Sequence, residues 1–305
     1  MALSLGSTNA IPTLRIKTPE RKPIIPYEKM KEILIDEGSF DYDEILTDDV
    51  ARSVCIFKKM GIKFVMKLGN HEPRGDTTKY NLLKNEDKVY LHLSNRLGAD
   101  YKKYFPAIID SGSSGEKFYY IIMEFIEGVT LYDYITESYK QNVAGLRNDV
   151  YTILLNLTKA LEVMYSTGII HGDLSVENVM IEKDHTVKLI DFEKSSKDIK
   201  LSVNTVGSTR LNINRQNAEG LGYFFLVLKL LSVTKSRSQS LIKGIRDVIE
   251  SCELSEKCTN IYSECIPLIN EARSSNNTKT RRDRKNGGGR TIRAPRAYRV
   301  LGLGA

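Results

Sequence analysis

One stretch of twenty-three residues, 170–192, constrains the fold of this chain more than any other. It reads IHGDLSVENVMIEKDHTVKLIDF. Two short apolar runs, 178–181 and 187–190, flank a polar turn at 182–186. Short β-prone runs on either side of a turn predict a β-hairpin with polar ends.

Three oxygen-bearing side chains lie next to the two predicted strands. Asp173 and Asn178 precede or begin the first strand, and Asp191 follows the second. Folding of the hairpin would therefore bring all three to one end of it. Because hard cations take oxygen ligands, two carboxylates and an amide on rigid strand ends predict a magnesium-phosphate site.

The overall composition is that of a globular protein with one large domain or two lobes. The 305 residues are 41% hydrophobic and 27% charged, which is ordinary for such a protein. No apolar run is long enough for a membrane span, and the N-terminal sequence lacks the features of a secretory signal. The four cysteines form no CxxC pair, which indicates free thiols in a reducing compartment. We therefore expect an intracellular protein of the cytoplasm or nucleus, without a membrane partner and not secreted.

The net charge of +7 comes from one end of the chain. Residues 274–305 hold nine of the 45 Lys and Arg residues and one of the 38 Asp and Glu residues, so this tail carries +8 and the remainder −1. The tail is rich in Ser, Asn, Arg and Gly, which predicts a disordered segment. Its basic residues are either simply solvated, or they bind nucleic acid or another acidic partner or act as a nuclear-import signal.

The rest of the chain divides into an N-terminal arm and two lobes. Residues 1–41 contain repeated prolines, which predict an extended arm, with one short helix at 28–36. Residues 42–128 predict a small α+β lobe, and residues 129–273 a mostly helical lobe. The predicted strands of the first lobe are 43–46, 53–58, 62–68, 106–111 and 117–124, with a turn at 112–115, and the predicted helices of the chain are 79–97, 146–167, 221–231 (apolar all round), 238–251 and 258–273.

Two motifs in this frame carry a resemblance to a known family. HGDLSVEN is followed, thirteen residues after Asn178, by Asp191 in LIDF. This pair resembles the catalytic loop and the metal-binding motif of protein kinases, which read HRDxxxxN and DFG. The resemblance implies a bilobal α+β protein kinase fold that uses ATP and Mg²⁺ to phosphorylate Ser or Thr hydroxyls of a protein substrate. It also implies that Asp173 is the catalytic base and that Asn178 and Asp191 hold Mg²⁺.

The first lobe adds further matches in the order that the family requires. Residues 64–67, FVMK, are similar to the VAIK strand. This implies that Lys67 contacts the ATP phosphates and that Glu86, on the following helix, pairs with it. Residues 123–128, MEFIEG, resemble the hinge between the lobes. The residues implied for the nucleotide base are Val54, Met123 as gatekeeper, and the backbone groups of Glu124 and Ile126.

Two stretches are most similar to one branch of the family. Residues 86–90, EDKVY, and 217–223, NAEGLGY, look like the casein kinase I and vaccinia-related kinase branch. In this interpretation Asn217 replaces the buried Asp that anchors the backbone of the catalytic loop. The short second lobe and the eroded motifs resemble a divergent member of the family, of the kind found in large DNA viruses.

Several positions depart from the family pattern. Gly172 replaces the Arg that binds a phosphorylated activation loop, which predicts that no such switch operates here. Glu193 replaces the Gly of DFG, and Ser175 stands where a Lys usually contacts the γ-phosphate. The nucleotide loop falls either at 47–53, which has no glycine, or at 38–40, GSF. These departures leave two other interpretations open, a nucleotide-binding or scaffolding pseudokinase and a small-molecule kinase.

Overall fold

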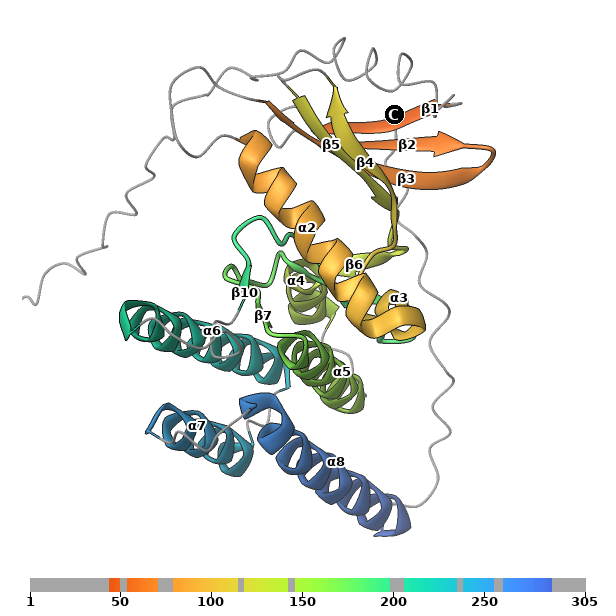
Figure 1. Cartoon of the computed structure of the whole chain (residues 1–305). Helices are drawn as coiled ribbons and strands as arrows, with labels where there is room; N and C mark the ends of the chain where they lie inside the picture. The colour runs from red at the N-terminus through yellow and green to blue at the C-terminus, as the bar shows by residue number, and fades with distance from the viewer. Residues whose placement is uncertain are drawn as a thin grey trace, which may run out of the picture.

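A computed structural model describes residues 44–49, 54–70, 79–114, 118–141, 146–197, 206–234, 238–254 and 260–286. The predicted N-terminal arm with its helix, the alternative nucleotide loop at 38–40 and the end of the tail lie outside these residues. The described residues form a β-sheet lobe above a helical lobe (Figure 1). The α+β bilobal fold predicted from the sequence is confirmed.

The upper lobe is a five-stranded antiparallel sheet in the order β1-β2-β3-β5-β4. Strands β2 and β3 meet at a tight turn, where Met60 and Gly61 have positive φ angles of 50° and 79°. Such angles give a two-residue turn the twist that a hairpin needs. The strands are β1 Glu44–Asp49, β2 Val54–Lys59, β3 Ile62–Asn70, β4 Ile108–Ser114 and β5 Phe118–Glu124.

The helix α2, Lys79–Leu97, runs diagonally below this sheet (Figure 1). Its bounds are those predicted from the 3.6-residue period of its apolar side chains. The buried side chains of α2 recur every three or four residues and include one acid, Glu86, among apolar neighbours. A fully buried carboxylate requires a partner charge, so this helix already marks the position of an ion pair.

The lower lobe is organised around α5, Leu146–Ser166, which buries ten of its side chains. The helices α6, Val206–Val233, and α8, Ile261–Asn286, pack against α5, and α7, Gln239–Leu254, packs against α6 and α8. Shorter elements connect the lobes and carry the loops between the helices. They are a single turn at Gly98–Asp100, α3 Tyr101–Tyr104, β6 Gly128–Thr130, α4 Leu131–Gln141, β7 Ile169–Ile170, β8 Val179–Glu182, β9 Val187–Leu189 and β10 Ser196–Lys197.

The hairpin predicted within 170–192 is present. Strands β8 and β9 pair in an antiparallel ladder, with Val179 opposite Leu189, and β6 adds a third strand. In the turn, Asp184 accepts hydrogen bonds from the backbone N–H and the hydroxyl of Thr186. The turn therefore fixes the register, which decides where the two ends of the hairpin meet.

The surface of α6 differs from the prediction for residues 221–231. These residues were expected to be buried all round, but Leu221 is 51% exposed and Phe225 is 60% exposed. Tyr223, Leu226, Val227 and Leu230 are buried on the other side. An apolar sequence shows that a helix can be buried, but it does not show which side meets the core.

Other predicted boundaries are also wrong. The turn predicted at 112–115 does not begin at Gly112, because β4 continues to Ser114 and the ring of Tyr120 lies over Gly112. The helix predicted to end at 273 continues as α8 to Asn286, so the first part of the basic tail is helical. None of the helices in the described part of the chain has both the length and the apolar character needed to cross a membrane.

Candidate active site

The ion pair expected between Lys67 and Glu86 joins the sheet to helix α2. The Nζ atom of Lys67 lies 2.8 Å and 2.9 Å from the two carboxylate oxygens of Glu86, and 3.4 Å from Oδ1 of Asp191. Burial lowers the pKa of Lys67, but the charges of Glu86 and Asp191 more than reverse this and hold it above its usual value. Lys67 is therefore a fixed cation at neutral pH.

The catalytic-loop residues meet at the open end of the hairpin, as the sequence predicted. Asn178 donates from Nδ2 to the backbone oxygen of Asp173 at 2.8 Å. The backbone N–H of Ile190 donates to the oxygen of Asn178 at 3.1 Å, which places the end of β9 beside the loop. Asp173, Asn178 and Asp191 are thus held by the same short region of backbone.

Asp191 has a backbone conformation that is uncommon for a residue with a side chain, with φ of 67°. Left-handed conformations at residues other than glycine are found mainly at Asn and Asp and often at functional sites. The next residue, Phe192, is fully buried, and its ring contacts those of Tyr90, Phe105 and His171. The buried ring holds the chain in position on the far side of Asp191.

His171 supports the loop from below and does not face the open site. It is fully buried, and its Nε2 lies 3.0 Å from the backbone oxygen of Ile190. Burial lowers the pKa of His171 to about 4, so the ring is neutral at physiological pH. These contacts are those of a packing residue.

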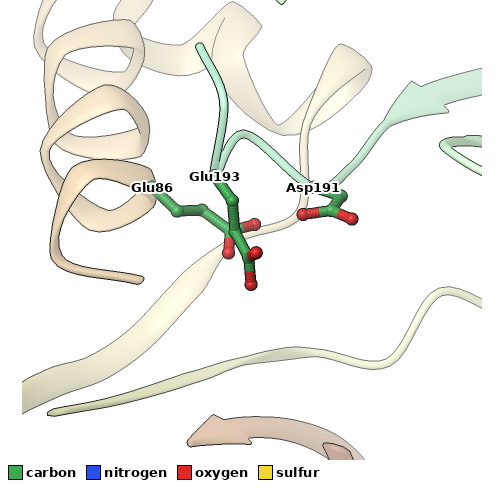
Figure 2. Close-up of side chains that lie close together, drawn as sticks. All are labelled: Glu86, Asp191 and Glu193. Atoms are coloured by element: carbon green, nitrogen blue, oxygen red, sulfur yellow. The ribbon is translucent and has the colours of Figure 1, made fainter. Parts of the chain in front are cut away.

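A third carboxylate lies beside Glu86 and Asp191, at the position where the family has glycine. Figure 2 shows the side chains of Glu86, Asp191 and Glu193 converging, and one oxygen from each lies within 4.8 Å of the others. Burial raises the pKa of Glu193, and the charge of Asp191 raises it further. The positive charge of Lys67 opposes this cluster of negative charge.

Glu219 is a functional residue that the sequence interpretation missed. Its buried carboxylate accepts hydrogen bonds from the backbone N–H groups of His171 and Gly172, the latter at 3.1 Å, and from the hydroxyl of Tyr262 at 3.3 Å. The sequence pattern assigned the anchoring of this loop to Asn217, whose side chain lies outside the described ones. The structure shows that Glu219, two residues further along α6, binds the loop backbone. The one available signal was an acid within an apolar helix.

The segment after Asp191 is attached to both lobes. Asn85 on α2 donates to the backbone oxygens of Glu193 and Ser195 at 3.2 Å and 3.0 Å. The Ser195 hydroxyl donates to the oxygen of His171 at 2.7 Å, and β10 pairs with β7. These contacts hold the start of the segment against the catalytic loop without an arginine in that loop.

Gly172 is required by this close packing. Its φ is 78°, and a Cβ atom at this position would lie 2.3 Å from the backbone oxygen of Lys194. A side chain such as that of the family's usual Arg would therefore displace the segment. The glycine at position 172 therefore allows residues 193–197 to pack directly against this loop.

The residues predicted for the nucleotide base lie along the other side of the site. Val54 stands opposite Lys67 in the β2–β3 ladder, and Met123 is buried opposite Val65. The N–H of Glu124 donates to the oxygen of Ala107 at 2.9 Å, and the oxygen of Ile126 accepts from the N–H of Gly128 at 2.8 Å. Strand β1 pairs with β2 up to Asp49 opposite Val54, and residues 50–53 of the nucleotide loop predicted at 47–53 lie outside the described residues.

Comparison with known proteins identifies a domain family. The family model described as "Protein kinase domain" matches residues 53–211. The chain is 38% identical over 73 residues to a probable serine/threonine-protein kinase PknB of Lactococcus lactis. It is 26% identical over 175 residues to a cAMP-dependent protein kinase, catalytic subunit-like, of Caenorhabditis briggsae.

These relatives are matched over part of their length. The first alignment covers 24% of this chain and 11% of the Lactococcus lactis protein. The second covers 57% of this chain and 40% of the Caenorhabditis briggsae protein. A third relative, the maternal embryonic leucine zipper kinase of Danio rerio, is 27% identical over 42% of this chain and 19% of its own length.

The buried acid Glu219 predicts a pH dependence of stability. Burial raises its pKa from 4.5 to about 7, so the folded state binds a proton more tightly than the unfolded state. The free energy of unfolding should therefore fall as the pH rises from 4.5 to 7, by up to about 3 kcal/mol. Urea unfolding of the wild type and of Glu219→Gln at several pH values measures this, because the amide cannot titrate.

The comparison of the two proteins removes the effect of His171. Its pKa is lowered by burial, so it adds stability as the pH rises, in both proteins alike. The difference in unfolding free energy between wild type and variant should thus change between pH 5 and pH 8. Parallel pH profiles would show that Glu219 is not the buried titrating group.

The close approach at Gly172 predicts a large cost for adding one carbon. Gly172→Ala should lose the roughly 1–2 kcal/mol of a left-handed alanine plus the cost of moving the oxygen of Lys194. Gly61→Ala is the matched control, because Gly61 has φ of 79° and no atom lies within 4 Å of the place that an added methyl group would take. Thermal unfolding should show the larger loss for Gly172→Ala, and equal losses would contradict the steric argument.

Proposed function

Since the chain belongs to the protein kinase family, we propose that it transfers the γ-phosphoryl group of ATP to a serine or threonine hydroxyl of a protein substrate. The observation that carries this proposal is the ion pair of Lys67 with Glu86, with Asp191 next to it. In protein kinases this ion pair must be in place for phosphoryl transfer. The names of the relatives support serine and threonine as acceptors.

Asp173 is the residue that we assign as the base. Its side chain is partly exposed at the rim of the site, which lets an acceptor hydroxyl approach its carboxylate. It would orient the hydroxyl and accept its proton as the oxygen attacks the γ-phosphorus. The bond from Asn178 to the backbone of Asp173 keeps the base in a fixed position for this step.

Asn178 and Asp191 are the residues that would hold Mg²⁺. Their donor atoms are a carboxylate and an amide oxygen, which suit this cation, and the Asn178 side chain is already oriented through its Nδ2. When bound, Mg²⁺ would neutralise part of the charge on the phosphates. Glu86 is occupied by Lys67, and its role would be to position that lysine.

The nucleotide base would lie between the lobes. We assign Val54 and Met123 to its apolar surroundings. For its polar edge we assign the carbonyl of Glu124 and the N–H of Ile126, because the opposite backbone group of each residue is already hydrogen bonded. The Glu124 side chain forms an ion pair with Lys188 on β9, which ties this strand to the lower lobe.

One observation favours a second candidate, a pseudokinase that binds nucleotide without transferring phosphate. Glu193 adds a carboxylate beside Asp191, where it repels phosphate and competes for any cation. The nucleotide loop predicted at 47–53 also contains no glycine. Against this, the lysine, its glutamate partner, the proposed base and both proposed metal ligands are all present.

We also propose finer points of identity that rest on the sequence. The motifs at 86–90 and 217–223 support a place in the casein kinase I and vaccinia-related kinase branch, and a viral source fits their divergence. The lobes at 42–128 and 129–273 would form the phosphotransfer unit. Action in the cytoplasm or nucleus is supported by the free thiol of Cys265, which is buried among the described residues.

The basic tail would bind nucleic acid or another acidic partner. Five of its positive residues, Lys279, Arg281, Arg282, Arg284 and Lys285, fall within α8. Basic residues that are close together in the sequence can release counterions from a phosphate backbone, which makes binding depend strongly on salt.

The proposed catalytic roles predict separable effects of two substitutions. Asp173→Asn should lower phosphate transfer to casein by roughly 10²- to 10⁴-fold while ATP still binds. Lys67→Met should weaken ATP binding as well. Transfer is measured with labelled ATP, and binding by the thermal shift with ATP and Mg²⁺, which is worth about 2.7 kcal/mol at a hundredfold excess over Kd.

Lys183→Ala is the control for these variants, because Lys183 is exposed in the β8–β9 turn. It should leave both transfer and binding unchanged. A thermal shift of the wild type without any transfer would favour the pseudokinase. Full activity in Lys67→Met would contradict the assignment of the site.

The proposed role of the tail predicts a change in salt dependence. Replacing the five basic residues of α8 by glutamine should weaken binding to a 30-base-pair DNA duplex and flatten the plot of log K against log salt. Lys183→Gln with Lys243→Gln, both exposed elsewhere, is the control. An unchanged slope, measured by fluorescence anisotropy, would remove the nucleic-acid hypothesis.

A further inference from the structure

Lys194 places a positive charge directly on the proposed base. Its Nζ atom lies 2.8 Å from Oδ2 of Asp173, and the two side chains are 60% and 40% exposed. An ion pair this exposed adds at most about 1 kcal/mol to stability. The pair is therefore poorly suited to holding the fold together, and its place at the site calls for another role.

The backbone of Lys194 is fixed, whereas its side chain is largely exposed. Its neighbours Glu193 and Ser195 accept hydrogen bonds from Asn85, and its own carbonyl lies against Gly172. The side chain of Lys194 therefore extends from a rigid backbone at the rim of the site. A long side chain on a fixed backbone can follow a ligand over a short distance without any change in the fold.

The distribution of charge shows where a cation is needed. Glu86, Asp191 and Glu193 face Lys67 on the upper side of the site. Asp173 lies on the lower side, where Ser175 in the same loop is neutral. Lys194 is the lysine that contacts Asp173 there, and the charges of Asp191 and Glu193 also act on it.

We propose that Lys194 binds the terminal phosphate of ATP beside Asp173 and so supplies the positive charge that Ser175 does not. This inference rests on the proposed function and names a further residue for it. During transfer, the acceptor oxygen bonds to the γ-phosphorus as the bond from that phosphorus to the bridging oxygen of ADP breaks. Asp173 takes the hydroxyl proton, and Lys194 stays protonated throughout and offsets the charge on the moving phosphoryl group.

The first test compares ATP with ADP, since only ATP carries the phosphate that Lys194 would contact. Lys194→Ala should weaken binding of ATP with Mg²⁺ about tenfold, the loss of one charge-assisted hydrogen bond, and leave ADP binding within about twofold. Isothermal titration calorimetry measures both. Lys183→Ala, an exposed lysine away from the site, should change neither.

The second test moves the charge to the catalytic loop. Ser175→Lys in the Lys194→Ala background should recover the preference for ATP over ADP and much of kcat, which Lys194→Ala alone should lower by roughly a hundredfold. Lys194→Arg should retain part of both. Recovery in this double variant would exclude a purely structural role of Lys194, because residue 194 is still alanine there. The ion pair between residues 194 and 173 therefore remains absent.

Several outcomes would overturn the proposal. Equal losses of ATP and ADP affinity in Lys194→Ala, or no loss, would show that Lys194 does not contact the terminal phosphate. A higher kcat would show that Lys194 blocks Asp173 instead. If the wild type binds ATP but transfers no phosphate, the proposed function fails, while the ratio of ATP to ADP affinity still decides the role of Lys194.

Discussion

The carboxylate of Glu86 is the group on which the rest of the site depends. It is fully buried on α2, it holds Lys67 of the sheet through both oxygens, and it accepts the backbone N–H of Phe192 at 3.2 Å. Leaving such a charge buried without its partner costs about 3–5 kcal/mol. The sheet, the helix and the exit of the hairpin are therefore held in one arrangement by a single acid.

A second buried acid, Glu219, holds the loop from below. Glu219 binds the backbone N–H groups of His171 and Gly172 from the side of α6. The loop between these two acids carries Asp173 at its exposed rim. The rigid contacts thus use backbone groups and buried side chains, so that Asp173 and Lys194 keep their charged ends open to a ligand.

The sequence could propose Lys67, Glu86, Asp173, Asn178 and Asp191 because their motifs resemble those of protein kinases in order and spacing. The structure brings Lys67 to Glu86 and Asp191, and Asn178 to Asp173. The sequence could not place Glu219, since a shift of two residues along a helix rotates a side chain by about 200°, and only packing sets that rotation. The same limit hid the exposed sides of Leu221 and Phe225. The contact between Lys194 and Asp173 depends on the backbone path at Gly172, which no periodicity describes.

The replacement of glycine by Glu193 fits a segment that keeps one conformation. In the described structure its backbone oxygen is held by Asn85, and the preceding Phe192 is buried among Tyr90, Phe105 and His171. Turning the segment over would expose that ring, at about 2–3 kcal/mol, and would break the hydrogen bonds of Asn85. A glycine is useful where the backbone must flip between states. Here a side chain is tolerated at position 193 because the segment does not need to flip. Gly172 stands in place of the arginine that binds a phosphorylated activation loop, and the segment is held through its backbone by Asn85.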